Sequence, residues 1–329
     1  MEYRTFVESR PVQISVCIPA HNEALTIKQI IENVLRISDV AVREILVCAN
    51  GCTDQTVDIV TELAEQHRKI RLLIEEKASK INAWNRLVRE ATSDIVVFFD
   101  ADITFECHSI APLVQASNHP NTLVASGVRM PDRNRITPER RFTGFIMHPL
   151  NQDYVYGGYY AFRKSSLLDH FRSIGLNEMP DSISEDIFLT VSIPKNQITI
   201  IPEAVAYFTP PSKDELVRYF ARGKAQLLDM QRRFPDLYAR FKNERAWDSN
   251  AFVVYLKKCT TRKKHISTFK GTFSAIGKRC FIFYRRTQFR RYVELLLSQP
   301  KESAMAHLTR SQTSRTLRTQ GSRKTRPSS

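Results

Sequence analysis

Apolar runs of strand length alternate with segments of helical period through the first hundred residues of the chain. Strand-like runs are short and rich in β-branched residues, and each is followed by apolar positions at helical spacing. The expected strands cover 13–19, 44–48, 70–74 and a run ending at Asp100, and the expected helices cover 24–35, 54 to about 67, and 79–91. This alternation predicts right-handed crossovers and a mostly parallel sheet with helices on both faces.

Polar clusters follow three of the four expected strands. They are Ala20-His21-Asn22-Glu23, Ala49-Asn50-Gly51-Cys52-Thr53-Asp54 and Asp100-Ala101-Asp102. Ligands of parallel sheets bind at the carboxyl ends of the strands, so the three clusters together predict a binding site. Alone, two aspartates after a strand are more often a solvated turn. With the other clusters, Asp100 and Asp102 are expected to hold Mg²⁺ or Mn²⁺, whose other ligands are phosphate oxygens.

Over roughly residues 12–230 the chain resembles the inverting glycosyltransferases of family 2, which have the GT-A fold. The motifs that carry the resemblance are Ile18-Pro19-Ala20-His21-Asn22-Glu23, Asn50-Gly51-Cys52-Thr53-Asp54, Asp100-Ala101-Asp102, Gly157-Gly158, Ser184-Glu185-Asp186 and Arg218-Tyr219-Phe220-Ala221-Arg222. The resemblance implies an α/β, Rossmann-like nucleotide-binding domain with a mostly parallel central sheet. It also implies a hexosyltransferase-like enzyme that uses a nucleotide-sugar donor.

The resemblance also suggests a role for individual residues. The expected donor-binding residues are Pro19, Ala20, Asn22, Glu23, Asn50, Asp54, Lys80, Asp100, Ala101, Asp102 and Arg222. Asp100 and Asp102 form the metal-binding DXD motif, and Asp186 takes the position of the catalytic base, with Glu185 as the second candidate. Gly157, Gly158 and Glu185 are expected near the acceptor.

Two departures from the family pattern narrow the prediction. Family members often carry two aspartates before the glycine of the second cluster, and this chain has Ala49 and Asn50 there. An amide can donate a hydrogen bond to a nucleobase or accept one from it, whereas a carboxylate only accepts. The sequence therefore predicts a nucleotide-sugar donor and leaves its base open, with a UDP-sugar as the first candidate. The Gln-x-x-Arg-Trp signature of processive polymer synthases is missing, which favours transfer of a single sugar.

Three candidate residues also have plainer interpretations. Ser184-Glu185-Asp186 matches a capping serine with acids in the first turn of a helix. Lys80 fits a solvated helix face equally well. Gly157-Gly158 interrupts an expected aromatic strand over 154–162, either to let a sugar approach the backbone or as a β-bulge.

Charge divides the chain into three expected parts. Of the net charge of +15, residues 251–329 carry 19 Lys and Arg against 2 acids, whereas the first 250 residues are near neutral. We expect a catalytic domain over 1–250, a basic helical extension over 251–302 and a disordered basic tail over 303–329. The segment Phe269–Leu297 mixes apolar and basic residues, as in helices on anionic membrane surfaces. A plain solvated extension stays open.

Composition bears on location and acceptor. The six cysteines lack metal-ligand spacing and indicate reduced thiols, and neither a secretion signal nor a membrane-spanning apolar run is found. A cytoplasmic enzyme is expected, peripheral on the inner face of the membrane if the extension binds lipid, with a saccharide or lipid-linked acceptor from polysaccharide or glycolipid biosynthesis.

Two other functions remain as alternatives. A nucleotidyltransferase on a similar sheet also needs paired acids and metal, but usually has a Gly-rich phosphate loop with a basic residue after the first strand, where this chain has Ala20-His21-Asn22-Glu23. The second alternative is a non-catalytic protein that binds sugar nucleotides, or nucleic acid through its tail. Asp100, Asp102 and Asp186 together disfavour loss of catalysis, and nucleic acid is disfavoured as a partner.

Overall fold

The computed structural model describes residues 12–132, 137, 140 and 154–245. Its sheet has eight strands: β1 (Gln13–Ala20), β2 (Ala41–Asn50), β3 (Ile70–Glu75), β4 (Ile95–Phe99), β5 (Thr104–Phe105), β6 (Val124–Pro131), β7 (Tyr159–Arg163) and β8 (Ile198–Phe208). The α-helices are α1 (Ile27–Leu35), α2 (Thr56–Gln66), α3 (Lys80–Glu90), α4 (Ile110–Ser117), α6 (Lys164–Ser173), α7 (Glu185–Ser192), α8 (Lys213–Arg233) and α9 (Pro235–Glu244). Two short 3₁₀ helices are η1 (Cys107–Ser109) and η3 (Lys195–Gln197).

The strand order is β3-β2-β1-β4-β7-β6-β8-β5. Strands β1 to β4 pair in parallel, as predicted from their helical connections, and β6 pairs in parallel with β8. Strand β7 runs antiparallel between β4 and β6, and β5 runs antiparallel to β8. The mostly parallel α/β sheet expected from the sequence is therefore confirmed.

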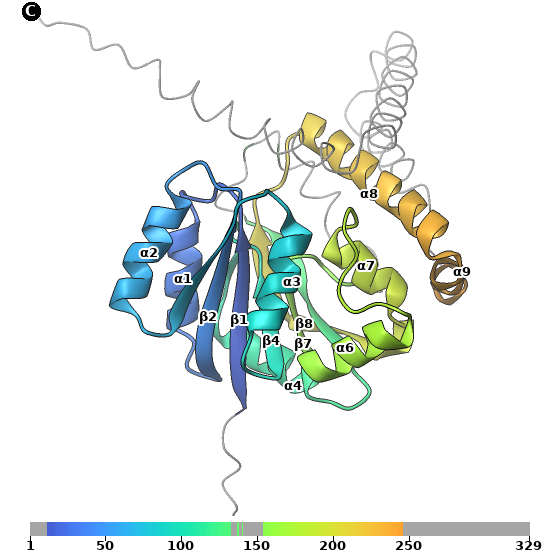
Figure 1. The fold of residues 1–329 in the computed structure, drawn as a ribbon, viewed down its shortest axis with the longest axis horizontal. Helices are drawn as coiled ribbons and strands as arrows, with labels where there is room; N and C mark the ends of the chain where they lie inside the picture. The colour runs from blue at the N-terminus through green and yellow to red at the C-terminus, as the bar shows by residue number, and fades with distance from the viewer. Residues whose placement is uncertain (1–11, 133–136, 138–139, 141–153, 246–329) are drawn as a thin grey trace, which may run out of the picture.

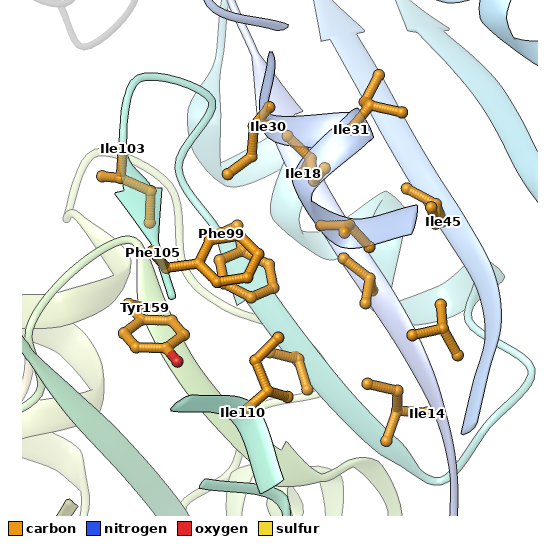
Figure 2. Packing of buried hydrophobic residues seen from close by; sticks show 14 of the residues in the cluster. Ile14, Ile18, Ile30, Ile31, Ile45, Phe99, Ile103, Phe105, Ile110 and Tyr159 are labelled. Atoms are coloured by element: carbon orange, nitrogen blue, oxygen red, sulfur yellow. The ribbon is translucent and has the colours of Figure 1, made fainter. Parts of the chain in front are cut away.

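Two apolar cores cover the two faces of the sheet. Alternate residues of β1 point to opposite faces, as strand geometry requires: Ile14, Val16 and Ile18 enter one core and Cys17 the other. The first core packs β1 and β4 against α1 and α4, and Figure 2 shows Ile18 and Ile30 on one side of Phe99 and Tyr159 on the other. The helices α1 and α2 lie on that face, and α3, α6 and α7 lie on the other (Figure 1).

The second core is rich in aromatic residues. Trp84 stacks on Phe98 and Phe162, and its indole N–H donates to the Tyr160 hydroxyl at 2.7 Å. Trp84 is thus a core residue, buried with these large rings against α3, α6 and α7. The packing anchors both β4 and β7, the two strands that carry the candidate site.

Local boundaries differ from the prediction in two places. The expected strand over 154–162 is wrong at its start, because β7 begins at Tyr159, after Gly157 and Gly158. Gly158 has φ +87°, which does not fit a strand, so the glycines precede the strand instead of interrupting it. Helix α1 begins at Ile27 and not at Ala24.

The C-terminal predictions fall mostly outside the described residues. Helix α8 includes the expected helical motif at 218–222 and packs against α7 and α9. No helix in the described ranges is long and apolar enough to cross a membrane. The extension over 251–302 and the tail over 303–329 lie outside the described residues.

Candidate active site

The site lies at the carboxyl end of β4, where the apolar strand gives way to Asp100 and Asp102. The Asp100 N–H donates to the Gly158 carbonyl at 2.8 Å, which extends the β4–β7 pairing one step beyond the strand. Asp100 is half-buried, whereas Asp102 is exposed to solvent. The two carboxylates therefore stand at the edge of the sheet where a ligand is expected.

Lys80 connects Asp100 with Glu185, a residue of α7. Its ammonium lies 2.7 Å from Asp100 Oδ1 and 2.5 Å from Glu185 Oε1. Desolvation works against the Lys80 charge, but the two carboxylates outweigh it and raise the pKa of Lys80. Lys80 is thus a partner of the acids and does not lie on a solvated helix face.

Glu185 is 2% exposed, and its second carboxylate oxygen has no hydrogen-bond partner among the described residues. Desolvation raises the pKa of Glu185, while Lys80 opposes this effect. The buried side chain faces Lys80, and its expected contact with an acceptor stays a prediction.

The glycine pair packs directly on two acids. A Cβ at Gly158 would lie 2.2 Å from Asp100 Oδ2, and a Cβ at Gly157 would lie 3.1 Å from Asp186 Oδ2. The space that the missing side chains leave is filled by the chain's own carboxylates. The two glycines therefore bring Asp100 and Asp186, which are far apart in sequence, against one short backbone segment.

Asp186 is fixed through one of its two oxygens. Asp186 Oδ1 accepts from the Ile187 N–H at 2.8 Å and from the Ser184 hydroxyl at 2.6 Å. Ser184 Oγ also lies 2.9 Å from Oε1 of the buried Gln226 in α8. The Ser184 hydroxyl has one proton, which it donates to Asp186. Its contact with Gln226 is then a hydrogen bond only if the Gln226 amide is flipped, so that the amide N–H donates to Ser184 Oγ.

The arrangement refines the interpretation of the Ser184 motif. Ser184 is the N-cap residue of α7, as the plainer interpretation holds, but its side chain makes no capping hydrogen bond. It holds Asp186 instead. With Oδ1 occupied, Oδ2 is the oxygen of Asp186 that can take a proton.

The first two polar clusters are joined to each other. Asn22, at φ +56°, accepts from the Thr53 N–H at 2.7 Å through Oδ1. Asp54 accepts from the Ala24 N–H and the Thr56 N–H, both at 3.0 Å. These bonds tie the loop after β1 to the loop after β2.

Two predicted donor contacts are engaged inside the protein. Asn50 is 3% exposed, and its amide donates to the Ala20 carbonyl at 2.7 Å, which an aspartate could not do. Both oxygens of Asp54 accept backbone N–H groups. The two residues therefore shape the loops, and their contact with a nucleotide stays a prediction.

Pro19 and Ala20 end β1, and Ala20 is buried. Ala101 is buried between the two aspartates. Arg222 lies in α8 with its guanidinium carbon 5.7 Å from the centre of the Tyr219 ring. The structure thus gathers most predicted residues at one edge of the sheet, in loops after β1, β2 and β4, before β7, and in α3, α7 and α8.

Negative charge accumulates around Asp102. Desolvation raises the pKa of Glu23 to about 8, and the nearby Asp102 charge adds to the effect. No cation forms an ion pair with Asp102 in the described part of the chain.

These properties fit a divalent cation. Exposed, hard carboxylate oxygens in an excess of negative charge are suitable ligands for Mg²⁺ or Mn²⁺. No group of three or more His, Cys, Asp or Glu residues forms a metal cage within the described ranges. Two carboxylates are fewer than the about six oxygen ligands that Mg²⁺ takes.

Arg129 of β6 was not among the predicted site residues. Its guanidinium carbon lies 5.0 Å from the centre of the Phe208 ring, and its side chain hydrogen-bonds that of Tyr219. Desolvation opposes its charge, but Tyr219 and Asp186 outweigh this and raise the pKa of Arg129. A cation within the strand segment 124–131, otherwise free of charge, is the sequence signal that could have revealed it.

Comparison with known proteins agrees with this geometry. Residues 15–175 match the model of the family described as glycosyl transferase family 2. The chain carries a family 2 glycosyltransferase domain. The matched segment includes the family 2 loops after β1, β2 and β4 and ends before α7.

Two curated relatives share this domain. Glycosyltransferase AglD of Haloferax volcanii is 30% identical over 158 residues, which are 43% of this chain and 25% of the relative. The probable glycosyltransferase YdaM of Bacillus subtilis is 33% identical over 107 residues, which are 31% of this chain and 26% of the relative. The matched region thus spans about a quarter of the length of either relative.

A solved structure shares the fold of this chain. Mannosyltransferase PcManGT from Pyrobaculum calidifontis, in complex with GDP-Man and Mn²⁺, superposes with a TM-score of 0.55 at 18% identity. The similarity covers 92% of this chain and 87% of that chain. The GT-A fold expected from the sequence is therefore confirmed.

Proposed function

We propose that this protein transfers one sugar from a nucleotide-sugar donor to an acceptor hydroxyl, with inversion and with the help of Mg²⁺ or Mn²⁺. The observation that carries the proposal is the glycine pair, which brings Asp100 and Asp186 to one place at the end of the sheet. The family 2 domain supports a glycosyltransferase over a nucleotidyltransferase.

The donor diphosphate would lie against Asp100 and Asp102, next to the joined loops after β1 and β2. A cation there would neutralise negative charge as the diphosphate leaves. Asp186 Oδ2 would take the proton of the acceptor hydroxyl, while Ser184 and the Ile187 N–H hold the other oxygen. Attack from the face opposite the leaving group gives inversion.

The buried position of Glu185 supports Asp186 as the base. Glu185 is 2% exposed and paired with Lys80, so an acceptor hydroxyl cannot reach it without moving the ion pair. We infer that Glu185 and Lys80 position Asp100, and that Asp186 removes the proton.

The base is tested with Asp186→Asn, which keeps the shape of the side chain and removes its basicity. Turnover should fall by about 10²–10⁴-fold while donor affinity changes only a few-fold. Glu185→Gln is the matched control. A dead Glu185→Gln enzyme beside an active Asp186→Asn enzyme would show that the base is Glu185.

The donor is tested by thermal shift with UDP-, GDP- and dTDP-sugars, with and without Mn²⁺. A ligand that binds the native state raises the melting temperature by mass action, so the true donor should stand out. We expect a UDP-sugar first, and the Mn²⁺-dependent part of the shift should disappear in Asp102→Asn. A folded Asp102→Asn protein with unchanged Mn²⁺-dependent affinity would contradict the metal assignment.

We propose in addition a saccharide or lipid-linked acceptor and peripheral attachment to the inner face of the membrane through the basic extension. The support is the charge of residues 251–329, with 19 Lys and Arg against 2 acids, because such segments bind anionic lipid.

A further inference from the structure

Gln226 is a polar side chain of α8 that is buried beside the proposed base. It is 7% exposed, and Leu227 and Met230 of the same helix lie in the second core with Phe188 of α7. A buried amide costs free energy unless its polar atoms are paired. In the described part of the chain, the side chain that meets this amide is Ser184, whose Oγ lies 2.9 Å from Oε1 of Gln226. The burial of Gln226 is therefore tied to Ser184.

The Ser184 hydroxyl faces away from the helix that it precedes. An N-cap serine normally accepts from a backbone N–H of the first helical turn, and Ser184 makes no such bond to α7. Its hydroxyl lies 2.6 Å from Asp186 Oδ1 instead. The lone pairs of Ser184 Oγ are thus available to a donor outside α7. With the Gln226 N–H donating to Ser184 and Ser184 donating to Asp186, one series of hydrogen bonds runs from α8 to the base.

Helix α8 also holds the chain that precedes the base. Arg233 follows Gln226 by seven residues, which places the two on one face of the helix. Its Nη1 donates to the Asp181 carbonyl at 2.8 Å. From α3, the Asn85 side chain donates to the Met179 carbonyl at 2.9 Å and accepts from the Met179 N–H at 3.0 Å. The segment before the base is therefore fixed between two helices, and through Gln226 this clamp reaches the base itself.

We propose that Gln226 is a positioning residue for proton transfer. It holds the Ser184 hydroxyl, which holds Asp186 Oδ1 and leaves Oδ2 in place to take the acceptor proton. The inference rests on the proposed function, because it gives α8 a part in the same reaction. A base has to lie within hydrogen-bond reach of the proton that it removes, and a carboxylate that can rotate spends less time there. Gln226 touches no reacting atom, so it acts on turnover and leaves donor binding unchanged.

The test is release of nucleoside diphosphate from UDP-glucose, GDP-mannose and dTDP-glucose with Mn²⁺, with water as the acceptor. Gln226→Met keeps the length of the side chain and removes the amide. We expect kcat to fall about fivefold, the effect of losing one neutral hydrogen bond, with KM for the sugar nucleotide unchanged. Gln226→Glu should lower kcat by about tenfold or more, because a carboxylate only accepts and competes with Asp186 for the Ser184 proton. A Gln226→Glu enzyme as active as the wild type overturns the proposal.

The matched control is Gln231→Met, the same change at an exposed position of the same helix, which should leave kcat and KM unchanged. Ser184→Ala removes the hydroxyl between α8 and the base, so Gln226→Met should lower kcat no further in that background. Losses that multiply in the double variant show that Gln226 does not act through Ser184, which overturns the proposal. If Gln226→Met does not fold, Gln226→Asn carries the test, since its shorter side chain withdraws the amide from Ser184.

A second measurement needs no turnover. Urea denaturation of Gln226→Met, Asp186→Ala and the double variant gives the coupling between two side chains that Ser184 links. Their effects on the unfolding equilibrium constant should depart from independence by about threefold or more, and independence should return in the Ser184→Ala background. Independent effects in both backgrounds overturn the inference. A wild type that neither binds nor cleaves any of the three sugar nucleotides contradicts the proposed function, and the urea series still decides whether Gln226 holds Asp186.

Discussion

Removing the Lys80 ammonium should destabilise the protein through the buried carboxylate that it leaves behind. Lys80→Met keeps the length of the side chain and removes the charge that lies 2.5 Å from Glu185 and 2.7 Å from Asp100. Breaking a buried ion pair by deleting one partner costs about 3–5 kcal/mol. Lys80 is 34% exposed and Asp100 25%, so water can partly replace the lost contact, and we expect about 3 kcal/mol.

The loss should depend on pH in a defined direction. Without Lys80, Glu185 is better accommodated when protonated, because desolvation already raises its pKa. In the folded variant Glu185 then keeps its proton at pH values at which the unfolded chain has released it. Folding therefore takes up a proton, and the loss of stability caused by Lys80→Met grows as the pH rises from about 5 to 8.

Urea denaturation of the wild type, Lys80→Met, Glu185→Gln and the double variant measures the coupling between the two residues. Lys77→Met, an exposed lysine just before the helix, is the matched control and should change stability by less than about 0.5 kcal/mol. The double variant should recover about half of the Lys80→Met loss, since no buried charge remains. A double variant as unstable as Lys80→Met would refute the view that Glu185 is the source of the penalty.

Three more predictions concern Ser184, Glu23 and the basic C-terminal segment. Ser184→Ala removes a donor that holds Asp186, so turnover should fall about 5–10-fold while donor affinity stays unchanged, whereas a merely structural loss would weaken donor binding as well. In EDTA, folding takes up a proton at Glu23 at pH values between the pKa of Glu23 in the unfolded chain and about 8. Glu23→Gln should therefore raise the melting temperature by more and more as the pH rises through this range. A difference in melting temperature that does not change with pH would contradict the raised pKa. Truncation at residue 250 should keep nucleotide binding and abolish cosedimentation with anionic vesicles, and equal cosedimentation with and without 251–329 would exclude a membrane role for this segment.

Much of the fold could be predicted because its first half repeats a local pattern. Apolar runs such as 13–19 and helical periods such as 79–91 are readable from neighbouring residues, and the structure places β1 and α3 there within a few positions. The insertion of β7 between β4 and β6 could not be predicted, because strand adjacency is decided by contacts distant in sequence. The predicted start of this strand at residue 154 was wrong, because the aromatic run before the glycines resembles a strand.

The candidate site was predictable as a set of residue types at strand ends and much less so as a set of contacts. The acids Asp100, Asp102 and Asp186 were recognisable from the motifs, and the structure brings Asp100 and Asp186 together. The roles of Gln226 and Arg129 depend on how α8 and β6 fold onto the site, which no local pattern encodes. Asn50 and Asp54 were expected to contact the donor, which stays a prediction, and the bonds by which they hold the two loops together could not be predicted from the sequence.

The bonds between the loops after β1 and β2 also bear on how the protein can be changed. Because Asn22 holds Thr53 and Asp54 holds Ala24, replacing one loop with that of a relative would leave unpaired polar groups in the other. The two loops should behave as a single exchangeable module. Engineering of donor preference in this chain therefore has to transplant both loops at once, and libraries that vary only one of them will mostly sample misfolded pockets.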